Sequence, residues 1–296
     1  MLGLLLLDKP EGITSFGAVA RIKRLTGEKR VGHTGTLDPM ATGVLPIFVG
    51  RATVLSQYLL DADKSYSATV KLGITTDTCD ITGTILSENS VDVKQSDIND
   101  TLKSFCGKQL QTPPMYSAIK QNGVRMYELA RRGETVEIPA REIEIFSLEQ
   151  TLPLDSDNKF DIECNVSKGT YIRSLCRDIG ESLGCGATLT RLCRTKTAGF
   201  DINNCVSLDS LTPENIQNYI LPCDLAVKYM PKILVSQKQA VRFCNGGELS
   251  LERLKIEEKK DDAIYRVYFD TKFLGLGKID ASKEALKIQC LVDRQV

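Results

Sequence analysis

Residues 32–46, GHTGTLDPMATGVLP, constrain the fold and the chemistry of this 296-residue chain more than any other segment. They include three glycines, two prolines, the only histidine of the chain and one carboxylate, Asp38. Glycine permits positive φ and close approach of two backbones, and Pro39 disfavours a helical conformation at Asp38. We therefore predict a stiff loop that presents a single carboxylate. Taken alone, an Asp-Pro pair is also typical of an ordinary turn.

The composition excludes several classes of protein. Ten cysteines are scattered without C-x-x-C spacing, so we expect reduced thiols in a cytoplasmic protein and not a disulfide framework. A single histidine argues against a zinc site. The apolar run at residues 2–7 lacks a basic flank and stops at Asp8, which predicts a buried strand and neither a signal peptide nor a membrane span.

Charge is balanced overall, with 38 basic and 38 acidic residues, but it is unevenly distributed. Residues 20–31 contain five basic residues and one acidic residue, and residues 168–196 contain six and two. Either cluster alone is typical of a solvated surface. Because the two clusters lie on either side of the motifs described below, we expect them to contribute to a phosphate-binding face.

The apolar pattern predicts an α+β fold with a mixed, largely antiparallel sheet flanked by helices. Strands are expected at residues 4–7, 44–49, 65–73, 81–86, 141–148 and 159–166, the third and fourth of them as a hairpin. Helices are expected at residues 51–60, 96–105, 124–132 and 171–183, after a first helix that Thr14 or Ser15 caps, that carries Phe16 on or near its apolar face and that Gly27 ends. Residues 1–230 are expected to form the main domain and residues 231–296 a small β-rich module.

Five blocks, in order along the chain, carry a specific resemblance. They are LDKP at 7–10, GHTGTLDP at 32–39 with ATGVL at 41–45, KSYSA at 64–68, PPMYSAIK at 113–120 and SKGTYIRSL at 167–175. With these blocks the chain resembles the TruB-type tRNA pseudouridine synthases, strongly over about residues 1–200 and weakly beyond them. Five ordered blocks are far more specific than one glycine-rich loop.

The resemblance implies the pseudouridine synthase fold and, over residues 231–296, a β-barrel-like module related to the PUA domains that bind RNA. An appendage that only packs on the main domain explains the same β-rich runs equally well. The implied activity is isomerisation of uridine 55 in the T-arm of tRNA, after the base is flipped out of its stack. The N1–C1′ bond breaks and the uracil rejoins through C5, so the implied enzyme is an isomerase that needs no cofactor or metal. We expect a monomer with tRNA as its partner and no membrane association.

The resemblance also assigns roles to individual residues. Asp38 matches the catalytic aspartate, which acts either as nucleophile at the sugar or as base at C2′. Arg173 matches the arginine that pairs with it, and we expect this cation to lower the carboxyl pKa. Tyr66 matches the active-site tyrosine, whose ring is expected to stack on the uracil and whose hydroxyl is a candidate for assisting proton removal from C5. Tyr116 and Ile119 either line the cleft or belong to the core.

Further residues are implied to bind the substrate. His33 is expected to face the RNA and help to fill the space left by the flipped base. Leu192 matches a leucine that packs on that base, and Lys9 and Lys64 are expected either to meet phosphate or to support the pocket. Cys193 stands where the family often has a second arginine, which leaves that RNA contact open.

Two other functions remain open from the sequence. The first is an RNA-binding or RNA-remodelling protein whose pocket is idle, that is, catalyses no reaction. Such a protein would have no chemical use for Asp38, Tyr66 and Arg173 together. A guide-RNA-dependent relative that acts on another RNA is the second alternative. Because the chain lacks the long basic tails expected of some such relatives, we expect it to act without a guide.

Overall fold

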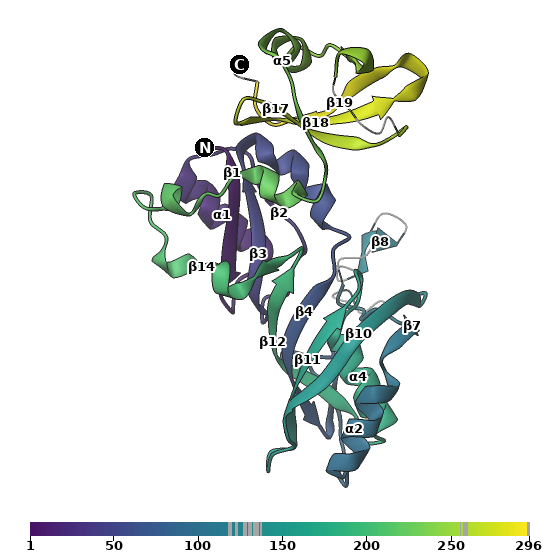
Figure 1. Ribbon diagram of the computed structural model, residues 1–296. Helices are drawn as coiled ribbons and strands as arrows, with labels where there is room; N and C mark the ends of the chain where they lie inside the picture. Colours follow the sequence, from purple (N-terminus) through teal and green to yellow (C-terminus); the bar gives the residue numbers. More distant parts are fainter. Residues whose placement is uncertain are drawn as a thin grey trace.

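The computed structural model is built around a ten-stranded and a five-stranded β-sheet with helices packed on them, and two two-stranded sheets lie at the side (Figure 1). It describes residues 1–117, 120–121, 124–126, 129, 132, 136, 138–254, 256 and 260–294. A ten-stranded sheet is built from strands that lie before residue 208, and a separate five-stranded sheet is built from strands after residue 231. The N-terminus lies on the side of the large part that faces the small sheet (Figure 1).

The large sheet is mixed and mainly antiparallel, so the predicted fold class is confirmed. Its strand order is β14-β1-β3-β12-β4-β11-β10-β7, with β2 beside β3 and β13 beside β12. Among its described strand pairs, β1–β14 and β3–β12 are the parallel ones. The strands are β1 (Gly3–Lys9), β2 (Val31–His33), β3 (Thr42–Val49), β4 (Lys64–Leu72), β7 (Gly107–Gln111), β10 (Arg141–Leu152), β11 (Lys159–Val166), β12 (Ala187–Thr197), β13 (Phe200–Asp201) and β14 (Val206–Ser207).

Helix α1 (Ser15–Thr26) has the predicted ends. The Thr14 side chain accepts a hydrogen bond from the backbone N–H of Gly17, and Gly27 ends the helix with a left-handed φ of 68°. The prediction that Phe16 lies on or near the apolar face is wrong, because its side chain is 73% exposed. The neighbouring residue, Ser15, points into the protein at this first turn.

The predicted hairpin of residues 65–73 and 81–86 is wrong. Strand β4 lies between β11 and β12 and pairs with both along its length. The hairpin that does form joins β5 (Ile74–Thr76) to β6 (Ile85–Glu88). An interior strand must pair on both edges, and both partners of β4 come from much later in the sequence. A prediction that pairs β4 with the next strand along the chain therefore fails.

Helices α2 (Gln95–Ser104) and α4 (Ile172–Ser182) pack on the same part of the large sheet, against β10 and β12 respectively (Figure 1). The helix expected at residues 51–60 is the 3₁₀ helix η1 (Gly50–Leu59). Of the helix expected at residues 124–132, residues 127, 128, 130 and 131 lie outside the described residues, and its first two residues form β9 (Val124–Arg125), which pairs with β8 (Lys120–Gln121). Short 3₁₀ turns complete the chain: η2 (Ile202–Asn204), η3 (Leu208–Ser210), η4 (Ile216–Tyr219), η5 (Cys223–Val227), η6 (Leu251–Arg253) and η7 (Ala281–Lys283).

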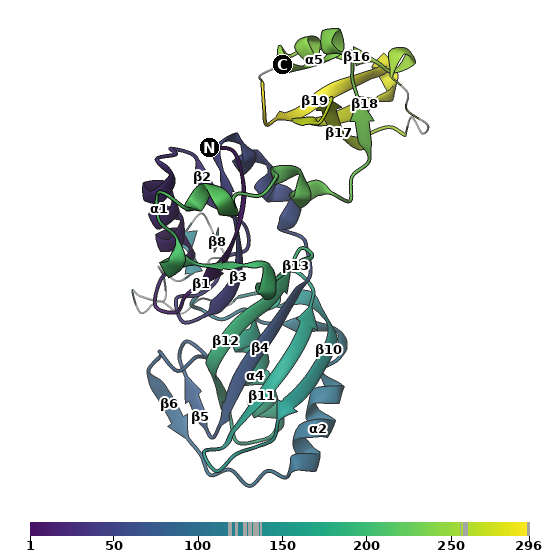
Figure 2. The same cartoon turned by 60° about the vertical axis from the view of Figure 1, so that its left-hand side comes forward.

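The small sheet curls beside helix α5 (Gln237–Cys244) in the order β15-β17-β18-β19-β16 (Figure 2). Its strands are β15 (Lys232–Leu234), β16 (Leu249–Ser250), β17 (Ile264–Phe269), β18 (Lys272–Asp280) and β19 (Ala285–Leu291). Leu276 and Val292 share an apolar cluster with Leu4, Leu6 and Phe48 of the large sheet. The small sheet is therefore joined to the large part by a buried contact. None of the described helices is long and apolar enough to cross a membrane.

Candidate active site

The candidate active site is a pocket of about 290 Å³ where the loop between β2 and β3 meets the N-terminal end of α4. Strands β4 and β12 supply further side chains to its wall. The lining residues are Gly35, Thr36, Leu37, Asp38, Lys64, Tyr66, Ser117, Gly169, Thr170, Tyr171, Ile172, Arg173, Leu192 and Arg194. Five of the residues expected from the sequence thus meet in one place: Asp38, Lys64, Tyr66, Arg173 and Leu192.

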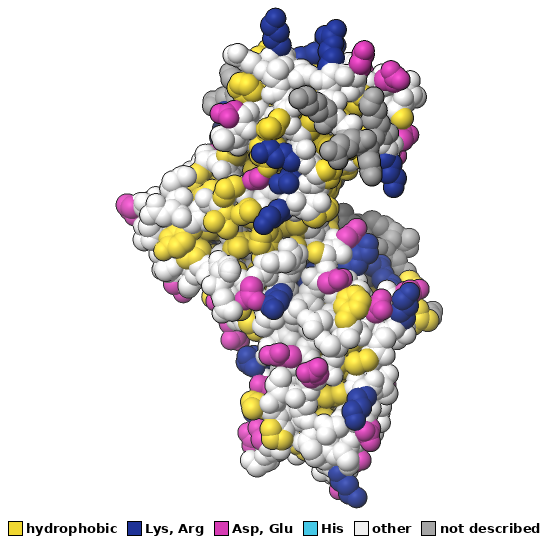
Figure 3. Space-filling view, in the orientation of Figure 1, with side chains coloured by type: hydrophobic (Ala, Val, Ile, Leu, Met, Phe, Trp, Pro, Cys, Tyr) yellow, Lys and Arg dark blue, Asp and Glu magenta, His cyan; other side chains and the backbone are white. Residues whose placement is uncertain are grey.

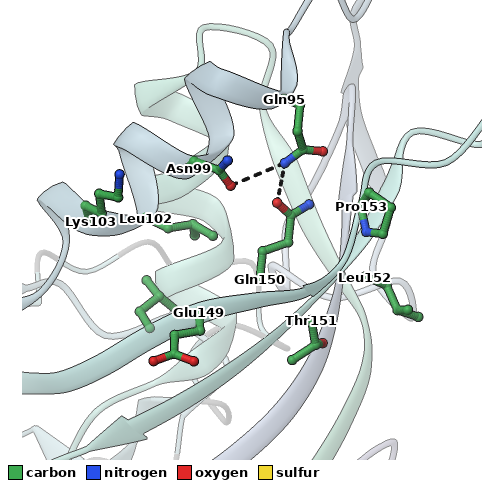
Figure 4. Close-up of a pocket in the computed structure, with 10 residues that line it drawn as sticks. Gln95, Asn99, Leu102, Lys103, Glu149, Gln150, Thr151, Leu152 and Pro153 are labelled. Carbon is green, nitrogen blue, oxygen red and sulfur yellow. Dashed lines mark hydrogen bonds between the residues drawn. The ribbon is translucent and has the colours of Figure 1, made fainter.

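A larger pocket of about 540 Å³ lies between α2 and β10 (Figure 4). Its polar groups are mainly amides, since Gln95 donates to Asn99 at 3.3 Å and also contacts Gln150. The charged groups of Lys103 and Glu149 point away from each other (Figure 4). No acid and cation converge in this pocket, so size alone does not identify the reactive site.

Asp38 and Arg173 form an ion pair in the smaller pocket, with 2.9 Å between Asp38 Oδ2 and Arg173 Nε. Arg173 lies in the first turn of α4 and only 5% of its side chain is exposed. Its Nη1 donates to the carbonyl oxygen of Thr78 at 3.0 Å, and its Nη2 donates to that of Tyr116 at 2.8 Å. Nη1 also lies 3.6 Å from Asp80 Oδ2. The guanidinium is therefore held by the protein before any substrate binds.

Burial raises the pKa of the Asp38 carboxyl group above its ordinary value, and the Arg173 guanidinium lowers it only in part. Arg173 lowers the carboxyl pKa as expected, but burial outweighs it, because protein atoms around the carboxylate remove more hydration than the ion pair replaces. The nearby Asp80 adds to the rise. A carboxylate with a raised pKa is a better base and nucleophile than an ordinary one.

The Asp38 loop is fixed by two polar side chains beneath it. Lys9 is fully buried, and its ammonium donates to three backbone carbonyl oxygens, two at 2.8 Å and that of Pro39 at 3.3 Å. Burial lowers the pKa of Lys9 to about 8. Ser15 Oγ accepts from the backbone N–H of Leu37 at 2.8 Å. Of the two roles expected for Lys9, its burial excludes phosphate contact and leaves support of the pocket.

Tyr66 and Leu192 form one wall of the pocket from the adjacent strands β4 and β12. Only 8% of Tyr66 and 6% of Leu192 is exposed, so both side chains are held firmly while they line the cavity. Lys64, at the start of β4, donates to the carbonyl oxygen of Leu60 at 3.2 Å and to that of Ala62. Burial lowers the pKa of Lys64 to about 8. Lys64 therefore supports the rim while its side chain still reaches the pocket.

His33 ends β2 outside the lining of this pocket. Burial, and then the nearby Arg194 charge, lower the pKa of its imidazole, and its Nδ1 is buried without a hydrogen-bond partner in the described part of the chain. In the block 113–120, Ser117 lines the pocket and Tyr116 contributes a carbonyl oxygen, while Ile119 lies outside the described residues. The described residues contain no His, Cys, Asp or Glu cluster suited to a metal ion.

Four residues of the site were not expected from the sequence. Arg194 is 1% exposed and lines the pocket, and the Asp80 side chain is 6% exposed beside Arg173. Ser117 and Tyr171 also line the cavity. The spacing of Arg194 offers a signal, because a residue two positions after a site residue on a strand shares its face, and Leu192 precedes it by two.

The two basic clusters are partly neutralised by acidic neighbours. Arg21 pairs with Asp209 at 2.8 Å, and Lys168 pairs with Asp61 at 2.9 Å. On the face shown in Figure 3, Lys and Arg side chains are interspersed with Asp and Glu. Phosphate binding by these clusters therefore stays a prediction.

Comparison with known protein families shows which family the chain belongs to. Residues 23–172 match the N-terminal domain model of the TruB family pseudouridylate synthases, and residues 173–228 match a C-terminal domain model of tRNA pseudouridylate synthase B. The chain belongs to the TruB family of pseudouridylate synthases. It is therefore an isomerase, and the resemblance read from the five blocks is confirmed.

Individual relatives agree over nearly the whole chain. The tRNA pseudouridine synthase B of Clostridium novyi is 45% identical, and the match covers 99% of this chain and all of that one. That of Clostridium kluyveri is 45% identical over 93% of this chain and 94% of its own. Among solved structures, a chain of a Cbf5-Nop10-Gar1 complex is 26% identical with a TM-score of 0.72, covering 98% of this chain and 85% of that chain.

Proposed function

We propose that this chain converts uridine 55 in the T-arm of tRNA into pseudouridine, with Asp38 as the catalytic residue. The observation that carries the proposal is the Asp38–Arg173 ion pair inside a pocket that Tyr66 and Leu192 also line. The relatives named tRNA pseudouridine synthase B support tRNA as the substrate. A pocket of about 290 Å³ is at the small end of the range for ligand sites, which suits one flipped nucleotide.

Each residue has a part in the chemistry. Extrusion of the base costs a few kcal/mol, which stacking on the Tyr66 ring and packing on Leu192 offset. Asp38 then acts on the sugar, either as nucleophile at C1′ or as base at C2′. Its raised pKa favours both roles, and Arg173 holds the carboxylate in place. The C5 proton must leave after the new bond forms, and the Tyr66 hydroxyl is the candidate group for assisting that step.

The rest of the molecule binds and orients the tRNA in this proposal. Residues 231–296 act as a PUA-like RNA-binding module beside the catalytic domain of residues 1–230. His33, close to the Asp38 loop, faces the RNA. The isomerisation exchanges no electrons or groups with another molecule, so in this proposal it needs no metal or cofactor. The protein works as a monomer.

The test is incubation of the purified chain with unmodified tRNA, followed by mapping of pseudouridine at single-nucleotide resolution. We expect modification at position 55 with no other component added. Modification only after a guide RNA is supplied would favour the guide-dependent alternative. Tight tRNA binding with no pseudouridine at any position would favour an idle pocket and contradict the proposal.

A further inference from the structure

Arg194 is a fully enclosed cation at the wall of the active site. It lies on β12, is 1% exposed and lines the pocket. Its Nε and Nη2 donate to the carbonyl oxygen of Val44 at 2.9 and 2.7 Å, and Nη2 also donates to that of Gly35 at 2.8 Å. One side chain thus joins β12 to both ends of the loop that carries Asp38.

The glycines of that loop make room for Arg194. A Cβ at Gly35 would lie 3.0 Å from Arg194 Nη1, and a Cβ at Gly43 would lie 2.3 Å from the Arg194 carbonyl oxygen. Both glycines also have positive φ, of 69° and 102°. Two of the three glycines in the segment 32–46 are therefore explained by close approach to this one residue.

Arg194 also lies beside Tyr66. The two residues are directly opposite in the antiparallel β4–β12 ladder, so their side chains share one face of the sheet. Burial raises the pKa of the Tyr66 hydroxyl, and the neighbouring Arg194 charge lowers it in part.

The charge of Arg194 has no acidic partner among the described ion pairs, unlike that of Arg173. The groups that accept hydrogen bonds from its side chain are the backbone carbonyl oxygens of Val44 and Gly35, and both are neutral. Enclosing a cation with neutral partners only is costly, and apolar residues of similar volume fill such a site more cheaply when shape is all that matters. A role in positioning neighbouring groups explains why a guanidinium group, and not an apolar side chain, occupies this site.

We infer that Arg194 is a positioning residue that holds the Asp38 loop and the Tyr66 side chain, which lies opposite it in the β4–β12 ladder, in one fixed arrangement. It acts through these groups and does not touch the reacting atoms. This inference rests on the proposed function, in which Asp38 and Tyr66 act on the same nucleotide. Misplacement of a reacting group by about 1 Å costs roughly 100-fold in rate, so loss of the fork should slow the chemical step and leave tRNA binding intact.

The kinetic test is a double-mutant cycle on Arg194→Met and Tyr66→Phe, read as the single-turnover rate at saturating tRNA. We expect Arg194→Met to be slower by about 100-fold with an unchanged Kd for tRNA. If Arg194 acts through the Tyr66 hydroxyl, the double variant should be within about two-fold of the slower single variant. If the rate losses of the two single variants multiply in the double variant, Arg194 does not act through Tyr66 and the inference is overturned. Lys159→Met, which changes a half-buried residue at the start of β11 whose side chain is 40% exposed, is the control and should keep the parent rate.

Arg194→Lys covers the case in which the methionine variant does not fold. It keeps the cation but loses the planar guanidinium that donates from Nε and Nη2 together, so it should be slower than the parent. A lysine variant with the parent rate would overturn the positioning role.

A second measurement separates this inference from the proposed function, because it needs no tRNA. Hydrogen exchange in residues 34–43 should be faster in Arg194→Lys than in the parent, while α5 of the small sheet should exchange at the parent rate. Unchanged exchange in residues 34–43 would refute the inference even if the parent makes pseudouridine. Faster exchange there would support it even if the parent made none, which would refute only the proposed function.

Discussion

Replacement of Arg173 by methionine is the perturbation whose cost the structure defines best. The variant keeps most of the side-chain volume but removes the cation 2.9 Å from Asp38 and 3.6 Å from Asp80. It also leaves the carbonyl oxygens of Thr78 and Tyr116 without their donors. The Asp80 side chain is only 6% exposed, and breaking a buried ion pair from one side costs about 3–5 kcal/mol, so we expect a loss of this size in the free energy of unfolding at neutral pH.

The loss should also depend on pH. The folded-state pKa of Asp38 is already raised, so the stability that this carboxyl group contributes falls as pH rises from its ordinary value through the raised one. Without Arg173 the pKa of Asp38 rises further, so the variant should lose more relative to the parent at pH 8 than at pH 5.

Urea titrations of parent and variant, at both pH values, measure this directly. Arg191→Met is the matched control, since Arg191 pairs with Asp161 at 3.1 Å with 55% of its side chain exposed. Such a surface pair contributes about 0–1 kcal/mol. If Arg173→Met costs no more than Arg191→Met, the ion pair does not hold the site together and the reasoning fails.

Three further predictions follow from other parts of the site. Gly43→Ala should slow isomerisation because its Cβ would lie 2.3 Å from a backbone oxygen of β12. Gly27→Ala is the control: a Cβ there has nothing within 4 Å, so it should only lower the free energy of unfolding, by about 1 kcal/mol. Equal rates in the two variants would contradict this. Since the pKa of Lys64 is about 8, Kd measurements should show tRNA binding weakening as its ammonium loses a proton above that pH, and Lys64→Met should flatten the dependence. Arg21→Ala combined with Arg24→Ala should reduce the slope of log K against log salt by roughly 0.7–0.9 for each phosphate that the two arginines neutralise in the parent, and an unchanged slope would make them ordinary surface residues.

Local signals in the sequence predicted local structure well. Thr14 and Gly27 bound α1 because a cap depends on a few neighbouring residues. The pairing of β4 was mispredicted because its partners, β11 and β12, lie far along the chain and no turn residue announces them. Phe16 was misplaced because the inward side of the first helical turn depends on Ser15 meeting Leu37, a contact across the fold.

The site residues likewise fall into those that local motifs predict and those that depend on contacts across the fold. Asp38, Tyr66 and Arg173 stand in motifs, so the sequence alone brought them together. Arg194 was missed because a charged residue on a strand is usually exposed, and only its long-range packing encloses it. The sequence predicts that Arg173 lowers the pKa of Asp38 but not that burial outweighs it, because desolvation depends on the atoms around the carboxylate.

The most direct test of the account is tritium release from tRNA labelled at C5 of uridine, under single-turnover conditions, with the parent and Asp38→Asn. Asparagine keeps the shape of Asp38 and removes its charge. We predict release by the parent together with pseudouridine at position 55, and no release above background by the variant, with a tRNA Kd close to the parent's. Release by Asp38→Asn near the parent rate would contradict the assignment of the chemistry to this carboxylate.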